Sequence, residues 1–301
     1  MLFKNLISFR LMEKIKLSAE ELAEKLAGFK FMLCASQQSY SIGWSAPIGE
    51  NLVHQANGFM MICLKKEERL LPATVINEML QDRIDGIEES EGRTLGKKAR
   101  AELKENLIFE LLPRAFTFSN KIYAYIDTKN DLLVIDSASL SKAEDLLSEL
   151  RKALGGLSAI PINTVEKPAF IMTNWLTHDS QPPEISIDNE CELHLPTEGG
   201  SIARFKRHDL ALPEIKNHLE NGKQVVKSAL TLNNRISFVL DSNFKISRLK
   251  FLELVQEKRS DEASNAKTEA ERFDVDFIIM TAELSEFLNN LIEIFGGEKR
   301  V

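Results

Sequence analysis

The sequence contains few cysteines and no long apolar run. Its three cysteines, Cys34, Cys63 and Cys191, are odd in number, lie far apart and form no CxxC pair, so neither a disulfide framework nor a zinc site is predicted. No apolar run approaches the ~18 residues of a membrane span, and charges interrupt the opening stretch MLFKNLISFRLMEKIKL. We therefore expect a protein of the reducing cytoplasm, with no membrane segment and no signal peptide.

Signatures of the common enzymes are missing as well. The glycines form neither the phosphate-binding pattern GxxxxGK followed by Ser or Thr, nor GxGxxG at a strand-to-helix junction. There is no GxSxG elbow, and the five histidines form no HExxH. The sequence therefore predicts a protein that works by binding rather than an enzyme, without a cofactor.

Two short patterns could still carry metal chemistry. Cys191 and His194 make a CxxH, which is half a metal site at most, and a coincidence in a surface loop is the other interpretation. Asp274 and Asp276, in the segment RFDVDFIIM, would point to the same side of a strand and could hold Mg²⁺ for phosphodiester cleavage. A solvated edge before a buried strand is the alternative. A metal-dependent nuclease thus stays open as a second function.

Composition and patterning predict an α+β protein. With 301 residues, 44% of them hydrophobic, the chain can form about two domains with ordinary cores. Ser18 with Glu21 is a capping box that predicts a helix over 18–27, and the apolar run 59–64 predicts a buried strand. Pro72 opens a helix, 85–96 is expected to be an exposed loop, and a second helix follows over 97–112. Together these form a helical hairpin at about 73–112 that projects from the sheet.

The rest of the chain repeats this mixture of strands and helices. Residues 122–126 and 132–135 predict a β-hairpin, and Ser141 with Glu144 predicts a capping box for the next helix. Further strands are expected over 202–205, 229–232, 236–240 and 245–249, with a helix from Pro213 to Gly222. Prolines after residue 160 divide the chain into two antiparallel-sheet and helix halves, 1–165 and 166–301. An amphipathic helix over 284–295 packs on the core or forms a dimer contact.

Charge is unevenly distributed along the chain. The formal net charge is -7, which argues against a polyanionic partner. However, residues 201–259 hold twelve basic and six acidic residues, a net charge of +6, whereas residues 260–301 carry -6. Such segregation predicts an electric field focused on one surface.

Two basic clusters are candidates for that surface. Extended backbone over SIARFKRH would put Arg204, Lys206 and His208 on one face at about 6.6 to 6.8 Å spacing, which suits contact with a phosphate backbone. A solvated strand is the alternative. The second cluster, Arg93, Lys97, Lys98, Arg100 and Lys104, begins a helix, where basic residues oppose the macrodipole by about 0.3 to 1 kcal/mol each. Either binding or simple solvation of an exposed helix explains it.

Several strings along the whole chain resemble one family. They are the opening LFKNLISFRL, Gly43-Trp44 followed by Pro47, LLPRAFTFS at 111–119, and the ending RFDVDFIIMTAEL with LIEIFGGE. In this order they are similar to the recombination-associated protein RdgC of proteobacteria. The resemblance implies a ring-forming homodimer whose basic hole encircles duplex DNA without sequence preference and restrains RecA in the nucleoid. A basic inner and an acidic outer surface would then coexist in a chain of net charge -7.

The resemblance also assigns residues. It implies a dimer contact in which Phe116 inserts into an apolar pocket of the partner, close to a basic loop. His208 stands where relatives can carry glutamine, and a partly protonated imidazole would make the contact pH-dependent. The expected dimer residues are Arg114, Phe116, Phe118, Lys206, Arg207 and His208. The rival assignment of Phe116 is a core residue.

The candidate DNA-binding residues come from both basic clusters. They are Arg93, Lys97, Lys98, Arg100, Arg204, Lys206, Arg207, Lys223, Lys227, Lys245, Arg248 and Lys250. Besides duplex DNA binding and metal-dependent cleavage, a third function remains open: a protein-interaction adaptor whose basic face meets acidic partners.

Overall fold

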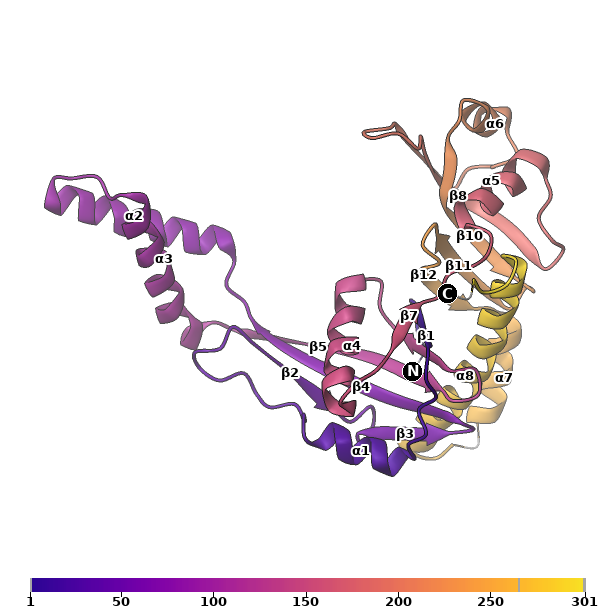
Figure 1. The fold of residues 1–301 in the computed structure, drawn as a ribbon, viewed down its shortest axis with the longest axis horizontal. Coiled ribbons are helices and arrows are strands. Elements are labelled where there is room, and N and C mark those ends of the chain that lie inside the picture. The colour runs from indigo at the N-terminus through magenta and orange to yellow at the C-terminus, as the bar shows by residue number, and fades with distance from the viewer. Residues whose placement is uncertain (1, 265, 300–301) are drawn as a thin grey trace.

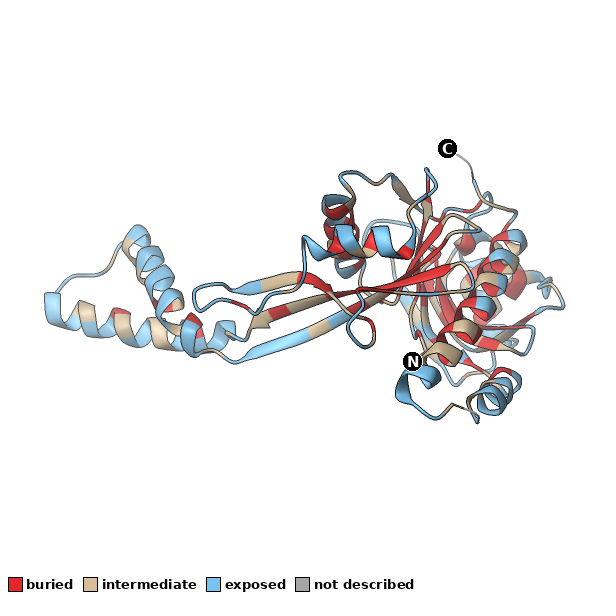
Figure 2. Ribbon diagram, turned by 90° about the horizontal axis from the view of Figure 1, so that it is seen from below, coloured by how far each residue is buried: buried red, intermediate tan, exposed pale blue. Residues whose placement is uncertain are grey.

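The computed structural model describes residues 2–264 and 266–299. Over these residues eight α-helices and two antiparallel sheets confirm the α+β class. Figure 1 shows a crescent, with a helical hairpin at one end, the second sheet at the other and the first sheet between them. Figure 2 shows that buried residues concentrate in the sheets and the helices packed on them, whereas the hairpin is mostly exposed.

The first sheet is built from the first half of the chain. Its strand order is β2-β4-β5-β6-β1-β7, and β3 also pairs with β4. The strands are β1 (Ile7–Leu11), β2 (Tyr40–Ser45), β3 (Val53–Ala56), β4 (Phe59–Arg69), β5 (Thr117–Asp127), β6 (Leu132–Ile135) and β7 (Ala159–Pro161). The predicted strand at 59–64 and the predicted β-hairpin are confirmed, although β4 and β5 are longer than expected.

Two helices, α1 (Ala19–Ala27) and α4 (Leu140–Leu154), cover one face of the first sheet. The capping box of Ser18 and Glu21 is present as predicted. The predicted capping box at Ser141 is wrong, because Ser139 caps α4 by accepting a hydrogen bond from the Lys142 backbone N–H. Ser137 in turn bonds the backbone of Ser139, which fixes the helix start two residues earlier than the pattern suggested.

The predicted helical hairpin extends from the long β4–β5 pair. It consists of α2 (Ala73–Glu91), α3 (Lys97–Leu111) and a 3-10 turn, η1 (Leu112–Arg114). The expected loop at 85–96 is wrong over 85–91, since α2 continues through Gly86 and ends at Gly92 in the left-handed region (φ 65°). A mid-helix glycine costs about 1 kcal/mol. Glu88 joins the two helices by accepting hydrogen bonds from the Leu95 backbone N–H and the Arg100 guanidinium.

The second sheet comes from the second half of the chain and has the order β12-β11-β10-β8-β9. Its strands are β8 (Ile185–His194), β9 (Ile202–Lys206), β10 (Gln224–Leu232), β11 (Ile236–Asp241) and β12 (Ile246–Phe251). The helices of this half are α5 (Pro168–His178), α6 (Pro213–Glu220), α7 (Glu253–Ala263) and α8 (Glu269–Ile294). The four strands and the helix predicted here are confirmed, although β10 begins at Gln224 rather than at 229, and the long strand β8 was not predicted.

Helix α8 lies between the two sheets. Its buried face joins one core with Phe59 and Tyr125 of the first sheet and Phe238 of the second. The Phe287 and Phe238 rings meet edge to face with centroids 4.9 Å apart. The predicted amphipathic terminal helix therefore packs on the core, which is the first of its two interpretations.

The chain's first residues connect the two sheets. Leu6 exchanges backbone hydrogen bonds of 2.8 and 3.1 Å with Ile246 of β12, and the next residue, Ile7, pairs with Ile135 in the first sheet. At this crossing Asp136 accepts the backbone N–H groups of Lys4 and Asn5. One extended segment thus belongs to both sheets in succession.

Candidate nucleic-acid interface

The second sheet has one apolar and one charged face. Along β8 and β9, Cys191, Leu193 and Phe205 point into the core, so their neighbours alternate to the opposite side. Helices α5, α7 and α8 lie on the outside of this sheet, and its other face is turned to the inside of the crescent (Figure 1). That other face, called the basic face below, carries Glu190, Glu192, Arg204, Lys206, Lys227, Arg248 and Lys250.

One row of the basic face crosses three strands. Glu192 of β8 lies directly opposite Arg204 of β9 on one side and Lys227 of β10 on the other. Its carboxylate is 2.9 Å from Arg204 Nε and 3.6 Å from Lys227 Nζ. The His194 ring nitrogen Nε2 is 2.7 Å from the same carboxylate. This row therefore alternates cation, anion, cation.

A second row lies one step along the strands. Glu190 lies opposite Lys206, and the Arg248 guanidinium reaches over from β12 to make hydrogen bonds of 2.7 and 3.0 Å to the Glu190 carboxylate. Lys250, opposite Ser237 of β11, is exposed. Five cations stand against the carboxylates of Glu190, Glu192 and Asp188, which accepts a hydrogen bond from Thr231 on the same face, so the face as a whole is cationic.

The two carboxylates are held in their charged form. The hydrogen bond from Arg248 is the main cause that lowers the pKa of Glu190. For Glu192, partial burial acts to raise the pKa, but hydrogen bonds from Arg204 and His194 and the charge of Lys227 outweigh it and leave the pKa below its usual range. At neutral pH both acids are therefore anions within a cationic surface.

The sequence predicted five residues of the basic face: Arg204, Lys206, Lys227, Arg248 and Lys250. The predicted alignment of His208 with Arg204 and Lys206 is wrong. β9 ends at Lys206, and Arg207 turns into the left-handed region (φ 54°). His208 instead pairs with Glu214 of α6, and its ring lies 5.5 Å from the inward-facing Phe205 ring.

Other predicted basic residues of this half lie at its turns. Lys223 Nζ is 3.2 Å from His218 Nδ1, and Lys245 Nζ is 3.5 Å from Asp241 in the β11–β12 turn. Arg207 is exposed directly after β9. These three side chains border the sheet rather than form its rows.

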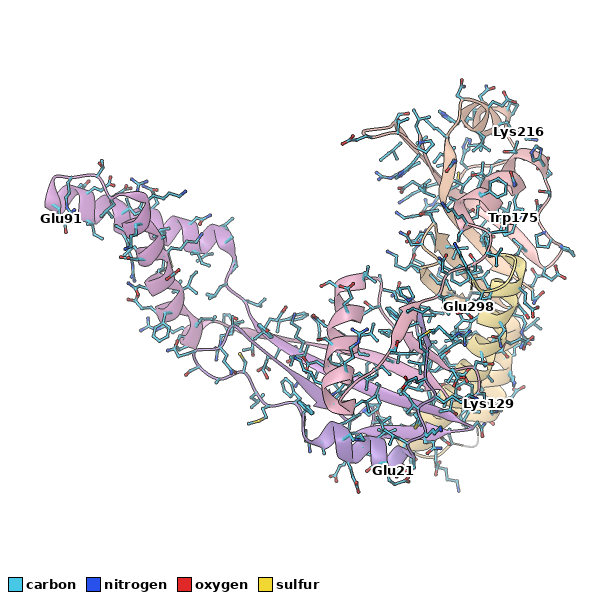
Figure 3. All side chains as sticks on the ribbon, in the orientation of Figure 1. Glu21, Glu91, Lys129, Trp175, Lys216 and Glu298 are labelled. Carbon is cyan, nitrogen blue, oxygen red and sulfur yellow. The ribbon has the colours of Figure 1, made fainter. Side chains whose placement is uncertain are left out.

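The hairpin cluster lies at the opposite end of the molecule. Arg93 pairs with Glu91 at 2.7 Å and Arg100 with Glu88 at 2.9 Å, while Lys98 is 93% exposed and 3.9 Å from Glu102. Figure 3 labels Glu91 at the hairpin tip and Lys216 on α6, at the two ends of the crescent. A single chain therefore does not bring the two predicted basic clusters together.

The acidic members of the basic face were not identified from the sequence. The signal was present, because Glu190 and Glu192 alternate with the buried Cys191 and Leu193 at a period of two. Both acids lie on β8, which precedes the basic segment 201–259. Strand β8 supplies the anions and β9, β10 and β12 supply the cations.

An exposed apolar region lies where the hairpin joins the first sheet. Phe116 is 85% exposed, so its interpretation as a core residue is wrong, and Phe118 is 51% exposed. Met32 and Leu33 are 76% and 75% exposed. They lie close by, because the Arg69 guanidinium donates hydrogen bonds to the carbonyls of Ala115, Cys34 and Ala35.

The predicted metal-binding patterns do not assemble. Asp274 and Asp276 lie on α8 rather than on a strand, because the run after them continues the apolar stripe of that helix and Thr268 with Glu271 caps its start. Residues two apart on a helix point to different sides. Asp276 pairs with Arg259 and Asp274 lies 3.2 Å from His54. Among residues 2–264 and 266–299 no group of three or more His, Cys, Asp and Glu is arranged to hold a metal ion.

The CxxH pattern has an ordinary structural role. Cys191 is buried in β8 and belongs to the core, and burial raises the pKa of its thiol to about 12. It is therefore not a surface-loop residue as one interpretation had it. His194 points to the basic face, two residues on from Glu192.

Comparison with known proteins identifies the family. The family model described as "Putative exonuclease, RdgC" matches residues 1–298. The chain belongs to the RdgC family. Relatives named "Recombination-associated protein RdgC" are 40% identical over 302 residues in Psychromonas ingrahamii and 40% over 303 residues in Aeromonas hydrophila, with at least 99% of each chain covered. The relative of that name in Yersinia pestis is 41% identical over 300 residues, 98% of both chains.

Membership of the RdgC family agrees with the resemblance seen in the sequence strings. The match covers both sheets, the hairpin and α8 alike, so the basic face lies within the matched residues. No helix within the described ranges is both long and apolar enough to pass through a bilayer.

Proposed function

We propose that this chain binds duplex DNA without sequence preference, as a homodimer that encloses the DNA, and thereby restrains recombination by RecA. The observation that carries the proposal is the basic face, where five cationic side chains from three strands lie on the inner side of the crescent. Neutralising phosphates with lysine and arginine is the main source of sequence-independent affinity.

The chemistry of the basic face supports contact with the DNA backbone. Its side chains are cations on a regular sheet, and the aromatic ring of β9, Phe205, points inward to the core. Proteins that bind single strands rely on aromatic stacking platforms, whereas phosphate contacts need only positioned cations. Such contacts carry no sequence information, so every duplex site is equivalent.

The shape of one chain supports a second copy. The basic face and the hairpin cluster occupy opposite ends of the crescent, so one chain surrounds a duplex only in part. Phe116, at 85% exposure, is an aromatic anchor suited to an apolar pocket of a partner. Two crescents that meet at their ends would enclose DNA, and their residence on it would deny the same DNA to RecA.

Binding across a salt series tests the proposal. We expect a random duplex to bind with log K falling linearly against log salt, with a slope of about 0.9 per neutralised phosphate. The double substitution Arg204→Gln with Lys206→Gln should weaken binding equally for all sequences and reduce that slope by about one to two per chain. A wild-type chain that does not bind random duplex, or binds it independently of salt, would overturn the proposal.

The same samples distinguish the two rival functions. A nuclease is kept as the second candidate because the family model carries the word exonuclease. Incubation of the duplex with Mg²⁺ and the chain should leave it intact if binding is the whole activity, and shortened products would favour the nuclease. An adaptor for acidic proteins predicts no binding to random duplex at moderate salt.

A further inference from the structure

Two carboxylates lie among the cations of the basic face and reduce its positive charge. Glu192 is 13% exposed and contacts both Arg204 and Lys227, which are 61% and 46% exposed. Glu190 is bound by the Arg248 guanidinium through two hydrogen bonds. In this way three of the five cations of the basic face already have an anionic partner within the chain.

These pairs are poorly explained by fold stability. Ion pairs at the protein surface contribute about 0 to 1 kcal/mol, and although the carboxylates here are partly buried, the cations of all three pairs are 46 to 61% exposed. The strands that carry them are already joined by backbone pairing, unbroken between β8 and β9 and with two register shifts between β8 and β10, and by the buried side chains of the opposite face. A neutral glutamine in place of either acid would keep a hydrogen-bonding partner for the arginines and lose little stability.

The pairs do have a direct effect on an anion arriving from solution. A phosphate that approaches Arg204, Lys227 or Arg248 must displace a carboxylate oxygen or bind beside a fixed negative charge. Asp241 does not act in this way on the face, because its carboxylate is held in the β11–β12 turn by the backbone N–H groups of Asn243 and Lys245.

We propose that Glu190 and Glu192 act as built-in competitors of the DNA phosphates, which lower the affinity of the basic face and keep its contacts exchangeable. This inference rests on the proposed DNA binding and adds its regulation. A protein that encloses DNA does not need tight contacts to stay on it. Weak, exchangeable contacts let it move along the duplex.

Replacing one carboxylate with its amide tests the inference. Glu192→Gln should lower the Kd for random duplex about two- to fivefold for each basic face that contacts the DNA, because no carboxylate then competes for Arg204 and Lys227. It should also steepen the salt dependence by up to about 0.9 in log–log slope per face. Glu190→Gln should have the same sign, which provides a second, independent variant if Glu192→Gln folds poorly.

Glu149→Gln is a matched control. Glu149 is 11% exposed, pairs with Lys152 at 2.6 Å and lies on α4 of the other half, so the substitution changes net charge equally but away from the basic face. Binding by all chains, with Glu192→Gln and Glu190→Gln no tighter than Glu149→Gln, would overturn the competitor role alone. Absence of binding by the wild type and every variant would instead overturn the proposed function.

Discussion

Asp136 shows how much one side chain can contribute to the connection between the sheets. Its carboxylate is 2.9 Å from the Asn5 backbone nitrogen and 3.1 Å from that of Lys4. Burial raises the pKa of Asp136, and the two backbone hydrogen bonds only partly oppose that rise. The folded chain therefore binds this proton more tightly than the unfolded chain.

Stability should consequently respond to Asp136 in a defined direction. Because the folded pKa is raised, the carboxyl's contribution is fully present below its ordinary value of 3.8 and is lost as pH rises through the folded value. Asp136→Asn keeps the acceptor oxygen and removes the charge, so we expect neutral-pH stability to be unchanged or higher. Asp136→Ala leaves two N–H groups unpaired and should cost about 1 to 2 kcal/mol in denaturant unfolding. Equal destabilisation by both variants would contradict this account.

Single residues also mark where sequence reasoning succeeded and where it could not. Ser18 with Glu21 formed the predicted capping box because both partners are local. Ser141 with Glu144 fits the same pattern but lost to Ser139, whose position depends on Ser137. The exposure of Phe116 depends on the whole fold, and periodicity alone could not distinguish it from a core residue.

The hairpin α2–α3 has a much smaller core than the sheets. Its buried apolar side chains over the described residues are Ile76, Ile84, Leu107 and Leu112. Few buried contacts and exposed backbone give a low local free energy of opening. We therefore expect the hairpin to open independently of the sheets.

Leu107→Ala tests this independence. Leu107 is completely buried, and deletion of such a leucine side chain costs about 2 to 5 kcal/mol. Hydrogen exchange should accelerate over residues 73–111 while protection in β4, β10 and α8 stays as in the wild type. Loss of protection throughout the chain would show that the hairpin and the sheets unfold together.

The helices and strands that were predicted well are those with a strong local pattern. The capping box at residue 18, Pro72 before α2, Pro213 at the start of α6 and the strands β9 to β12 follow from neighbours in sequence, whereas β8 was not predicted. The apolar run in RFDVDFIIM predicts a strand, but these residues belong to the first part of the 26-residue helix α8. Short apolar runs fit both structures, and only packing between two sheets decided for a helix.

At the scale of the whole molecule, the proposed dimer predicts how loss of the Phe116 contact should affect DNA binding. Phe116→Ala should weaken self-association by at least about 2 kcal/mol in sedimentation equilibrium, as expected of an aromatic anchor. If the proposed ring forms, its opening would end the enclosure of DNA, so retention on closed circular DNA should fall more than binding to a short linear duplex. Phe170→Ala, which removes another exposed ring (54%) on α5, is the control and should change neither.

Equal loss on circular and linear DNA would contradict enclosure while leaving simple binding in place. The comparison of circular with linear DNA tests the ring, which the sequence predicted only through its resemblance to the RdgC family. Composition and charge could indicate a basic surface, but the inner side of a crescent is made by the placement of the two sheets around α8. That placement depends on contacts between distant parts of the chain.

The pairing of Leu6 with Ile246 has a consequence for biosynthesis. The ribosome makes Leu6 long before its partner on β12, and Arg10 binds Glu298, which lies 288 residues further along the chain. Contacts between such distant residues form slowly, because a long loop must close before they can stabilise anything. A nascent chain stopped before β12 would lack the partners of the Leu6 backbone and of the Lys4 carbonyl, which are Ile246 and Leu249. The two sheets can therefore join at this crossing only after the ribosome has made β12.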